Sequence, residues 1–138
     1  MTRVVVDTFV FVSSILSPHN PPAQILDLIL SRRILALISE RILAEYREVL
    51  GREEFSFNPE MVQSLLQFIQ TYAETVALTP MKISLPDASD EPFLACALQG
   101  KADFLITGNK KHFPSSLCRP ARVVSPSEFL ELLKEKNL

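Results

Sequence analysis

The chain has 138 residues, of which 47% are hydrophobic and 22% are charged, and its formal net charge is −2. This length fits one domain that buries roughly two-thirds of its unfolded surface, and the composition excludes a disordered chain. The small net charge excludes attraction to nucleic acid or to an acidic membrane through total charge alone, although local patches can still bind either. We therefore expect residues 1–138 to form a single domain.

The two cysteines, Cys96 and Cys118, are too few for a disulfide framework or a zinc cluster. Cys96 lies among alanines and leucines, which predicts a small buried side chain. The N-terminus lacks the basic and apolar regions of a secretory signal, and no apolar run reaches the ~18 residues that span a bilayer. We therefore expect a reduced, cytoplasmic protein with no membrane partner.

Strands and helices are predicted to alternate along the chain. Residues 3–6 are Arg-Val-Val-Val, and this run without polar alternation predicts a strand buried on both faces. Further strands are predicted at 34–38, 75–78, 104–106 and 122–124, and helices at 10–16, 23–32, 40–50, 59–72, 90–98 and from 126 onward. This alternation predicts an α/β fold of three layers, α/β/α, with a central parallel sheet of about five strands.

Capping residues mark the predicted helix ends. Ser39 can cap the helix that follows it, and Gly51 is expected at the left-handed position after that helix. Gly100 is expected to close the helix that begins near residue 90. Ser125 and Glu128 form a capping box around the first turn of the last helix.

Three acidic residues are candidates for one site. Asp7 ends the first strand, and ligands of open α/β sheets bind beyond the carboxyl ends of the strands. Glu45 lies on the border of the apolar stripe of its helix, so it can lean over the sheet edge; the alternative is a surface glutamate paired with Arg41 or Arg52. Asp90 points into the apolar stripe of the next candidate helix, where a charge is costly unless paired or metal-bound; the alternative is a helix cap.

Polar residues also follow the strand at 104–106. Thr107 and Asn109 should lie in the same crevice as Asp7, since carboxyl ends of neighbouring parallel strands meet at one edge. Asp87 is expected to be a turn residue, and Asp103, which begins its strand, should lie at the opposite edge.

This oxygen-rich set suits Mg²⁺ or Mn²⁺ rather than zinc. With only three glycines the chain offers no phosphate-binding glycine loop. Serines and histidines are present for a Ser–His–Asp system, but no nucleophile-elbow pattern supports one.

The sequence resembles the PIN-domain family over nearly its full length. The resemblance is carried by VVVDTFVFVSSIL, LAEYREVL and DASDEPFLACALQGKADFLITGNKKHF, of which the third segment is the most specific. It is most similar to members that are toxin components of prokaryotic toxin–antitoxin pairs. The resemblance implies a small metal-dependent ribonuclease that uses Mg²⁺ or Mn²⁺ to hydrolyse RNA phosphodiester bonds. It also implies a cognate antitoxin as protein partner and a homodimer.

The resemblance implies roles for five residues. Asp7, Glu45 and Asp90 match the acidic positions of the family, and Thr107 matches the threonine before its last acidic position. That last position is Asn109 here, which can ligate through its carbonyl oxygen but carries no charge. The implied metal ligands are therefore Asp7, Asp90, Glu45 and Asn109, and these residues with Thr107 form the implied catalytic set.

A second departure from the family is Phe9, which stands where the family has asparagine. Loss of such a supporting polar group reduces metal affinity or activity about 10–100-fold. The alternative function is therefore a catalytically weak or inactive PIN-like module that binds RNA or protein.

Two further alternatives are a structural protein whose acids cap helices, and a phosphoryl-transfer enzyme with Asp7 as nucleophile. The haloacid-dehalogenase form of the last expects aspartate at position 9.

Basic residues gather after the candidate site. Residues 101–122 contain five lysines and arginines against one acidic residue. Lys110 and Lys111 could neutralise RNA phosphates; the alternative is a solvated loop. His112 is expected to be a structural or surface residue, and Phe113 a packing residue.

Overall fold

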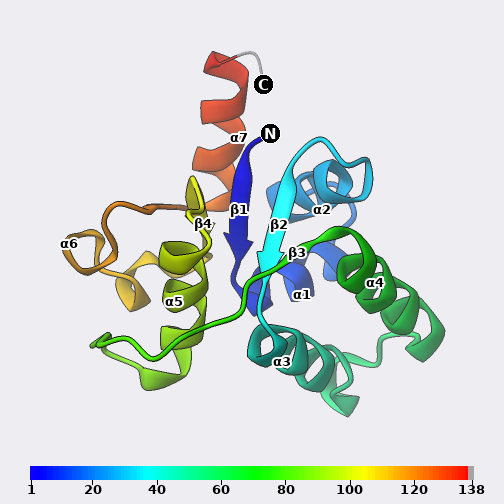
Figure 1. Cartoon of the computed structure of the whole chain (residues 1–138). Helices are drawn as coiled ribbons and strands as arrows, with labels where there is room; N and C mark the ends of the chain where they lie inside the picture. Colours follow the sequence, from blue (N-terminus) through cyan, green and yellow to red (C-terminus); the bar gives the residue numbers. More distant parts are fainter. Residues whose placement is uncertain (137–138) are drawn as a thin grey trace.

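A computed structural model describes residues 1–136, and in it five parallel strands form one sheet (Figure 1). The strands are β1 (Arg3–Val6), β2 (Leu35–Ile38), β3 (Glu74–Thr75), β4 (Phe104–Ile106) and β5 (Arg122–Val124), in the order β3-β2-β1-β4-β5. β1 is central, and its valines are at most 1% exposed. The predicted α/β fold is confirmed. Residues 137–138, which end the predicted domain range, lie outside the described residues.

The helices cover both faces of the sheet. They are α1 (Thr8–Leu16), α2 (Pro21–Leu30), α3 (Glu40–Leu50), α4 (Pro59–Tyr72), α5 (Glu91–Gln99), α6 (Ser115–Cys118) and α7 (Pro126–Glu135). α2 packs against α1 and α7 on one side, and α5 packs against β1, β2 and β4 on the other (Figure 1). α3 lies beyond the carboxyl ends of the strands and contacts α1, α4 and α5. Within residues 1–136 no helix is long and apolar enough to cross a membrane.

The third strand is shorter and earlier than the predicted range 75–78. It consists of Glu74 and Thr75, which pair with Leu37 and Ile38 of β2. One more bond follows, from the Val76 N–H to the Ile38 carbonyl at 2.7 Å. β2 then ends at the cap of α3, so the chain after position 76 has no partner strand. The prediction failed because partner length, rather than local sequence, sets this boundary.

The helix caps follow the sequence, except that Gly51 does not have the left-handed conformation of a residue that follows a helix end. Ser39 accepts a hydrogen bond from the Ile42 N–H at 3.2 Å, and the capping box of α7 is present. Gly51 has φ −88°, so the left-handed position predicted for it is wrong. Gly100 closes α5 with φ −85°, while Lys101 has φ 55°. Gly100 is needed for space, since a Cβ there would lie 2.8 Å from the Cys96 carbonyl oxygen and from a Val76 methyl.

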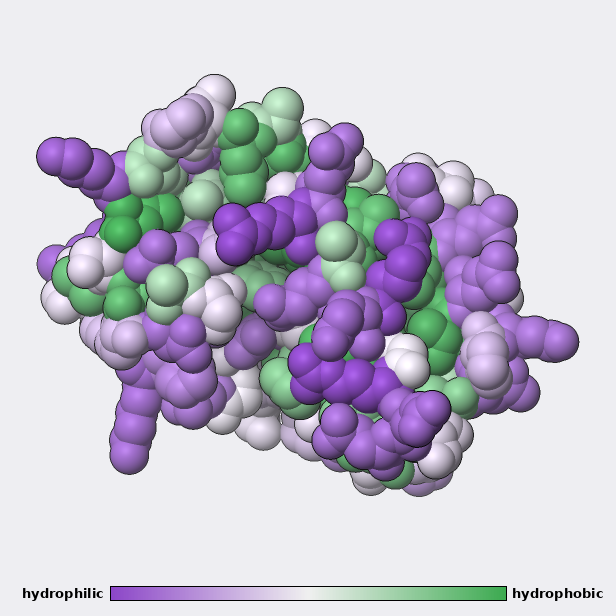
Figure 2. Space-filling model, turned by 90° about the horizontal axis from the view of Figure 1, so that it is seen from below, coloured by the Kyte–Doolittle hydropathy of each residue, from purple (hydrophilic) through white to green (hydrophobic). Residues whose placement is uncertain are grey.

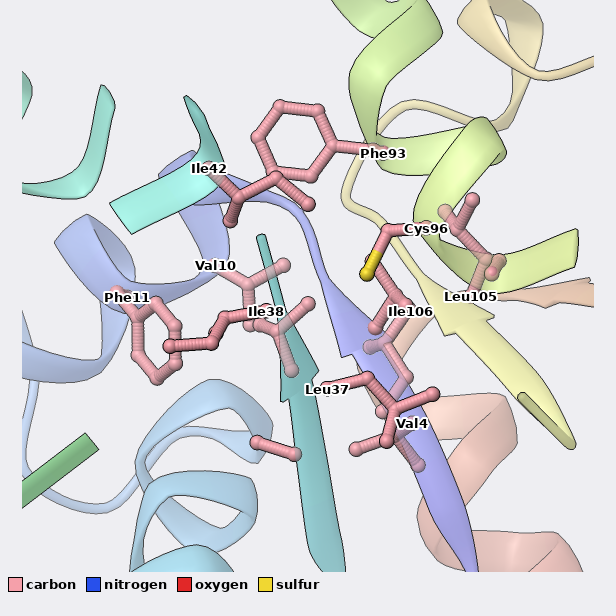
Figure 3. Packing of buried hydrophobic residues seen from close by; sticks show 14 of the residues in the cluster. Val4, Val10, Phe11, Leu37, Ile38, Ile42, Phe93, Cys96, Leu105 and Ile106 are labelled. Carbon is pink, nitrogen blue, oxygen red and sulfur yellow. The ribbon is translucent and has the colours of Figure 1, made fainter. Parts of the chain in front are cut away.

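The core packs the helices on the central strands. Val4, Leu37 and Leu105 are fully buried, and Cys96 of α5 lies against strand side chains of this cluster (Figure 3). Cys96 and Cys118 are buried free thiols, as predicted for Cys96. This packing holds the ends of β1 and β4 in fixed register, with Val6 beside Ile106.

Candidate functional site at the carboxyl ends of β1 and β4

β1 and β4 are neighbours in the sheet, but the strand that follows β1 in the chain (β2) lies on one side of this pair and the strand that follows β4 (β5) lies on the other. Such a switch point leaves a crevice beyond the strand ends. Asp7 follows β1 and Thr107 follows β4, and the Thr107 hydroxyl donates to Asp7 Oδ2 at 2.8 Å. The Asp7 N–H also donates to the Ile106 carbonyl at 2.9 Å. The strand ends therefore fix the position of the Asp7 carboxylate through both backbone and side chain.

Glu45 is brought to the same edge by its neighbour Tyr46. The buried Tyr46 hydroxyl donates to the Val6 carbonyl at 2.5 Å, and its ring packs edge-on against Phe11 with centroids 4.9 Å apart. This anchor fixes α3 against the end of β1. The half-buried Glu45 carboxylate then accepts a hydrogen bond from the hydroxyl of Thr8, the residue after Asp7.

Asp90 reaches the site from the turn before α5 and is only 8% exposed. Its side chain makes no capping hydrogen bond, so the structure does not support the helix-cap alternative. His112 Nδ1 lies 3.0 Å from Asp90 Oδ2, although this contact lacks hydrogen-bond geometry. Within residues 1–136, Asp90 Oδ2 is thus a buried oxygen without a hydrogen-bond partner.

The carboxylates of Asp7, Glu45 and Asp90 lie close enough for the charges of Asp7 and Glu45 to affect the pKa of Asp90. Burial raises the pKa of Asp7, and hydrogen bonds from Thr107 and Thr8 lower it by less. Burial also raises the pKa of Asp90 to about 6. His112 lowers this pKa, whereas the charges of Asp7 and Glu45 raise it. The carboxylates therefore repel one another, and each negative charge makes the next more costly.

These residues line a cleft of about 910 Å³. Its charged walls comprise the carboxylates Asp7, Glu45, Glu48, Asp87 and Asp90 and the guanidinium groups of Arg41 and Arg52. Figure 2 looks onto the carboxyl edge of the sheet, where hydrophilic side chains surround a hollow. The cleft therefore carries more negative than positive side chains.

A family model described as the PIN domain matches residues 3–111, a range that contains the ends of β1 and β4 and the carboxylates Asp7, Glu45 and Asp90. The chain belongs to the PIN-domain family. Among individual proteins, the chain is similar to an uncharacterized protein of Methanocaldococcus jannaschii. The two are 28% identical over 120 residues, which cover 78% of this chain and 71% of that protein.

Two solved structures share the PIN fold of this chain, each with a TM-score of 0.57 and coverage of 90% of this chain and 98% of the other. One is VapBC2 from Rickettsia felis bound to a DNA fragment from their promoter, at 17% identity. The other is FitAcB from Neisseria gonorrhoeae, at 18% identity. At these identities the likeness concerns the fold alone.

The residues expected in the PIN site lie at different depths. Asp7, Glu45, Asp90 and Asn109 line the cleft, while Thr107 is fully buried beneath it. Asn109 is exposed, and its backbone N–H donates to the Thr107 hydroxyl at 3.1 Å. The loop after β4 thus contacts the same Thr107 hydroxyl that donates to Asp7.

The basic residues after β4 lie outside the lining of this cleft. Lys110 Nζ forms an ion pair with Glu128 of α7 at 2.9 Å, and Lys111 is exposed. Asp87 accepts from the backbone and side chain of Ser89, as expected of a turn residue. Asp103 accepts from the Arg3 N–H at the opposite edge of the sheet, as expected.

Sequence reasoning missed that His112 and Phe9 line this cleft of the PIN domain. His112 lies in the turn after β4, where neither helical nor strand periodicity indicates direction. Its only sequence signal is its place soon after a strand end. Phe9 is 52% exposed although it is aromatic, which hydrophobicity alone does not predict.

The donor set suits a hard divalent cation. Asp90 Oδ2 is buried without a hydrogen bond, and the repulsion among Asp7, Glu45 and Asp90 would be relieved by a positive ion. In the described part of the chain, no three Asp, Glu, His or Cys side chains come together as one ligand group. Mg²⁺ commonly binds one or two carboxylates and completes its shell with water. The arrangement fits that mode rather than an all-protein cage.

Proposed function

We propose that this PIN domain is a ribonuclease that requires Mg²⁺ or Mn²⁺ and hydrolyses RNA phosphodiester bonds. The observation that carries this proposal is the buried Asp90 Oδ2, which lines the same cleft as Asp7 and Glu45 and has no hydrogen bond, only the 3.0 Å contact with His112 Nδ1. A buried carboxylate without hydrogen bonds is costly, and such groups persist where function uses them. A bound cation would satisfy this oxygen.

In this mechanism Asp7 and Asp90 would hold the ion, and Glu45 would act through water. A bound ion would supply a water of lowered pKa for attack on phosphorus and would offset charge on the phosphate. The Thr107 hydroxyl keeps Asp7 Oδ2 in place, which leaves the other carboxylate oxygen for the cleft. Thr8 holds one oxygen of Glu45 in the same way. Asn109 orients water or phosphate from the exposed side.

The charge of the cleft supports a cation in the reaction. Five carboxylates against two arginines would repel a polyanion such as RNA. If Asp7 and Asp90 held a divalent ion, their negative charge would be offset and the centre of the cleft would attract phosphate instead of repelling it. Asp7 and Asp90 would then serve both binding and hydrolysis.

We also propose that the protein is the toxin of a toxin–antitoxin pair, acts in the cytoplasm and forms a homodimer. Its two buried free thiols suit a reducing compartment. The antitoxin proposal follows the family resemblance, and the fold is shared with chains of VapBC2 and FitAcB. Co-expression with a small protein encoded beside it, followed by co-purification and growth measurements, tests this part.

Cleavage of a labelled single-stranded RNA with Mn²⁺ or Mg²⁺ tests the activity. We expect cleavage that disappears with EDTA and in Asp7→Asn and Asp90→Asn, while the exposed Glu48→Gln keeps it. Cleavage that survives Asp7→Asn would contradict the proposal.

The second candidate is a PIN module that binds RNA with little turnover, favoured by Phe9 in the cleft and by the uncharged Asn109. Binding of RNA and Mn²⁺ without cleavage would establish it. Activity gained in Phe9→Asn would identify Phe9 as the cause.

A further inference from the structure

Phe9 places an exposed aromatic side chain in a cleft that also contains five carboxylates. It lies in the first turn of α1, two residues after Asp7, and is 52% exposed. It is absent from the set of side chains that form or cover the hydrophobic core. Its ring is therefore available to a ligand that enters the cleft beside Asp7.

Arg41 lines the same cleft from α3, one helical turn before Glu45. Within residues 1–136 it has no ion-pair partner. Arg52, by contrast, is paired with Glu48 at 3.0 Å, and Lys110 with Glu128 at 2.9 Å. Arg41 is thus a guanidinium group free to bind phosphate at the cleft wall.

We propose that Phe9 stacks on an unpaired nucleobase of an RNA whose scissile phosphate lies near Asp7 and Asp90, while Arg41 binds a neighbouring backbone phosphate. This inference rests on the proposed function and assigns Phe9 and Arg41 as the residues that position the RNA. In duplex RNA the bases are already stacked on one another, so Phe9 has no face to contact. Aromatic stacking is tolerant of base identity, which predicts weak sequence preference at this position.

The surroundings of Phe9 favour a nucleotide over an apolar protein segment. The cleft lining includes apolar residues such as Val10, Pro22 and Phe93, but it also carries Arg41 and five carboxylates, whose charges an apolar segment would leave without partners. Leu16, the other exposed apolar residue of α1, is 61% exposed but does not line the cleft. A nucleotide combines the flat apolar face and the negative charge that Phe9 and Arg41 together require.

The test uses the full chain, which contains no tryptophan, so that Phe9→Trp introduces a single fluorophore into the cleft. Binding of a 5′-labelled single-stranded RNA and of its matched duplex is measured in Ca²⁺ to limit cleavage. We expect Phe9→Trp to bind like wild type with quenched tryptophan emission, and Phe9→Leu to bind single strands about 10–100-fold more weakly. Duplex binding should not change.

Two variants complete the design. Arg41→Gln should weaken single-strand binding. It should also reduce the slope of log affinity against log salt concentration by about 1, the change expected when one phosphate contact is lost. Leu16→Ala, which removes an equally exposed side chain of the same helix, should leave RNA binding unchanged. Thermal melting should show that Phe9→Leu is folded, because the replaced ring is half exposed.

The outcomes separate this inference from the proposed function. Wild-type binding by Phe9→Leu, or unquenched Phe9→Trp, overturns the stacking role, even if cleavage occurs. Binding that depends on Phe9 with no cleavage in Mn²⁺ overturns the ribonuclease function alone. Absence of both binding and cleavage overturns both. Equal losses in Leu16→Ala and Phe9→Leu would show that RNA binding depends on α1 as a whole and not on stacking by Phe9, and would also overturn it.

Discussion

The hydroxyl of Thr107 donates to Asp7 Oδ2 at 2.8 Å and so joins two residues that lie 100 positions apart. Thr107 is fully buried, and its oxygen also accepts from the Asn109 N–H. The Thr107 side chain therefore links the end of β1 to the loop after β4. We expect the pKa of Asp7, its metal affinity and the stability of the protein to depend on this contact.

Thr107→Val keeps the shape of the side chain but removes its hydroxyl. We expect the pKa of Asp7 to rise further, because the lost hydrogen bond lowers it, and Mn²⁺ affinity to fall about tenfold. Stability should fall by about 1 kcal/mol. Calorimetric titration with Mn²⁺ and urea unfolding measure the two effects. Thr107→Ser should restore both, and unchanged affinity in Thr107→Val would refute a positioning role.

Asp90→Asn should stabilise the protein in EDTA at pH 7.5. Burial holds the pKa of Asp90 at about 6, above its ordinary value of 3.8, so ionisation costs more in the folded than in the unfolded state. The native state then binds more protons between these two values, and wild-type stability rises as pH falls through about 6 towards 4. We expect a gain of order 1 kcal/mol, or about 4 °C in melting temperature, that vanishes near pH 4.

The control for this prediction is Glu48→Gln, which removes another cleft carboxylate that is exposed and paired with Arg52. Its melting temperature should change by less than about 1 °C, since exposed ion pairs contribute little. A lower melting temperature for Asp90→Asn at pH 7.5 would show that the Asp90 charge is already compensated in the folded protein.

Gly100→Ala should destabilise the protein by about 2 kcal/mol or more. Its new Cβ would lie 2.8 Å from the Cys96 carbonyl oxygen and 2.9 Å from a Leu37 methyl, so the end of α5 must shift from β2. Gly108→Ala is the control, because nothing lies within 4 Å of a Cβ there. Equal urea midpoints for the two variants would contradict the steric argument.

Lys101→Gly should have the opposite effect at the same helix end. Lys101 has φ 55°, and the N–H groups of Lys101 and Ala102 donate to the Leu98 and Ala97 carbonyls in the pattern of a Schellman cap. Glycine adopts this conformation without the strain of a Cβ. We expect a gain of about 0.5–1 kcal/mol by urea unfolding, and a loss would show that the Lys101 side chain contributes more than its strain costs.

Tyr46→Phe tests the anchor that places Glu45. Loss of the hydroxyl leaves the buried Val6 carbonyl without that bond, which should cost about 1–2 kcal/mol. If α3 is held by this contact, Mn²⁺-dependent cleavage should also fall, as in Glu45→Gln. Full activity in Tyr46→Phe would mean that packing against Phe11 is sufficient.

The sequence predicts the centre of this structure better than its edges. β1 is recognisable because a strand buried on both faces must be apolar throughout, and Asp7 then marks its end. Asp90 is recognisable because it lies in line with the apolar face of the helix predicted at 90–98. β3 is not predictable locally, since the end of β2 limits it. Gly100 closes α5 as predicted, but its close contacts with Val76 and Leu37, which make glycine necessary, cannot be predicted from local sequence.

In the candidate site as well, residues on regular elements are predictable from the sequence, whereas residues in turns are not. Acids on periodic elements can be assigned to a face, so Asp7, Glu45 and Asp90 were predicted at one cleft, and the structure places them along it. His112 lies in a turn without periodicity, and its contact with Asp90 depends on how that turn folds. The pairing of Lys110 with Glu128 depends on α7, which begins sixteen residues later in the chain.

The order of the strands also governs when the cleft can exist during synthesis. β1 leaves the ribosome first, but one of its two neighbours, β4, is made about a hundred residues later. Until then Asp7 lacks Thr107, and the part of the cleft wall that Asn109 and His112 form is absent. A truncated or unfinished chain that ends before β4 therefore carries Asp7 and Asp90 without the residues that complete their surroundings. The cleft can form only after the chain has been synthesised past His112.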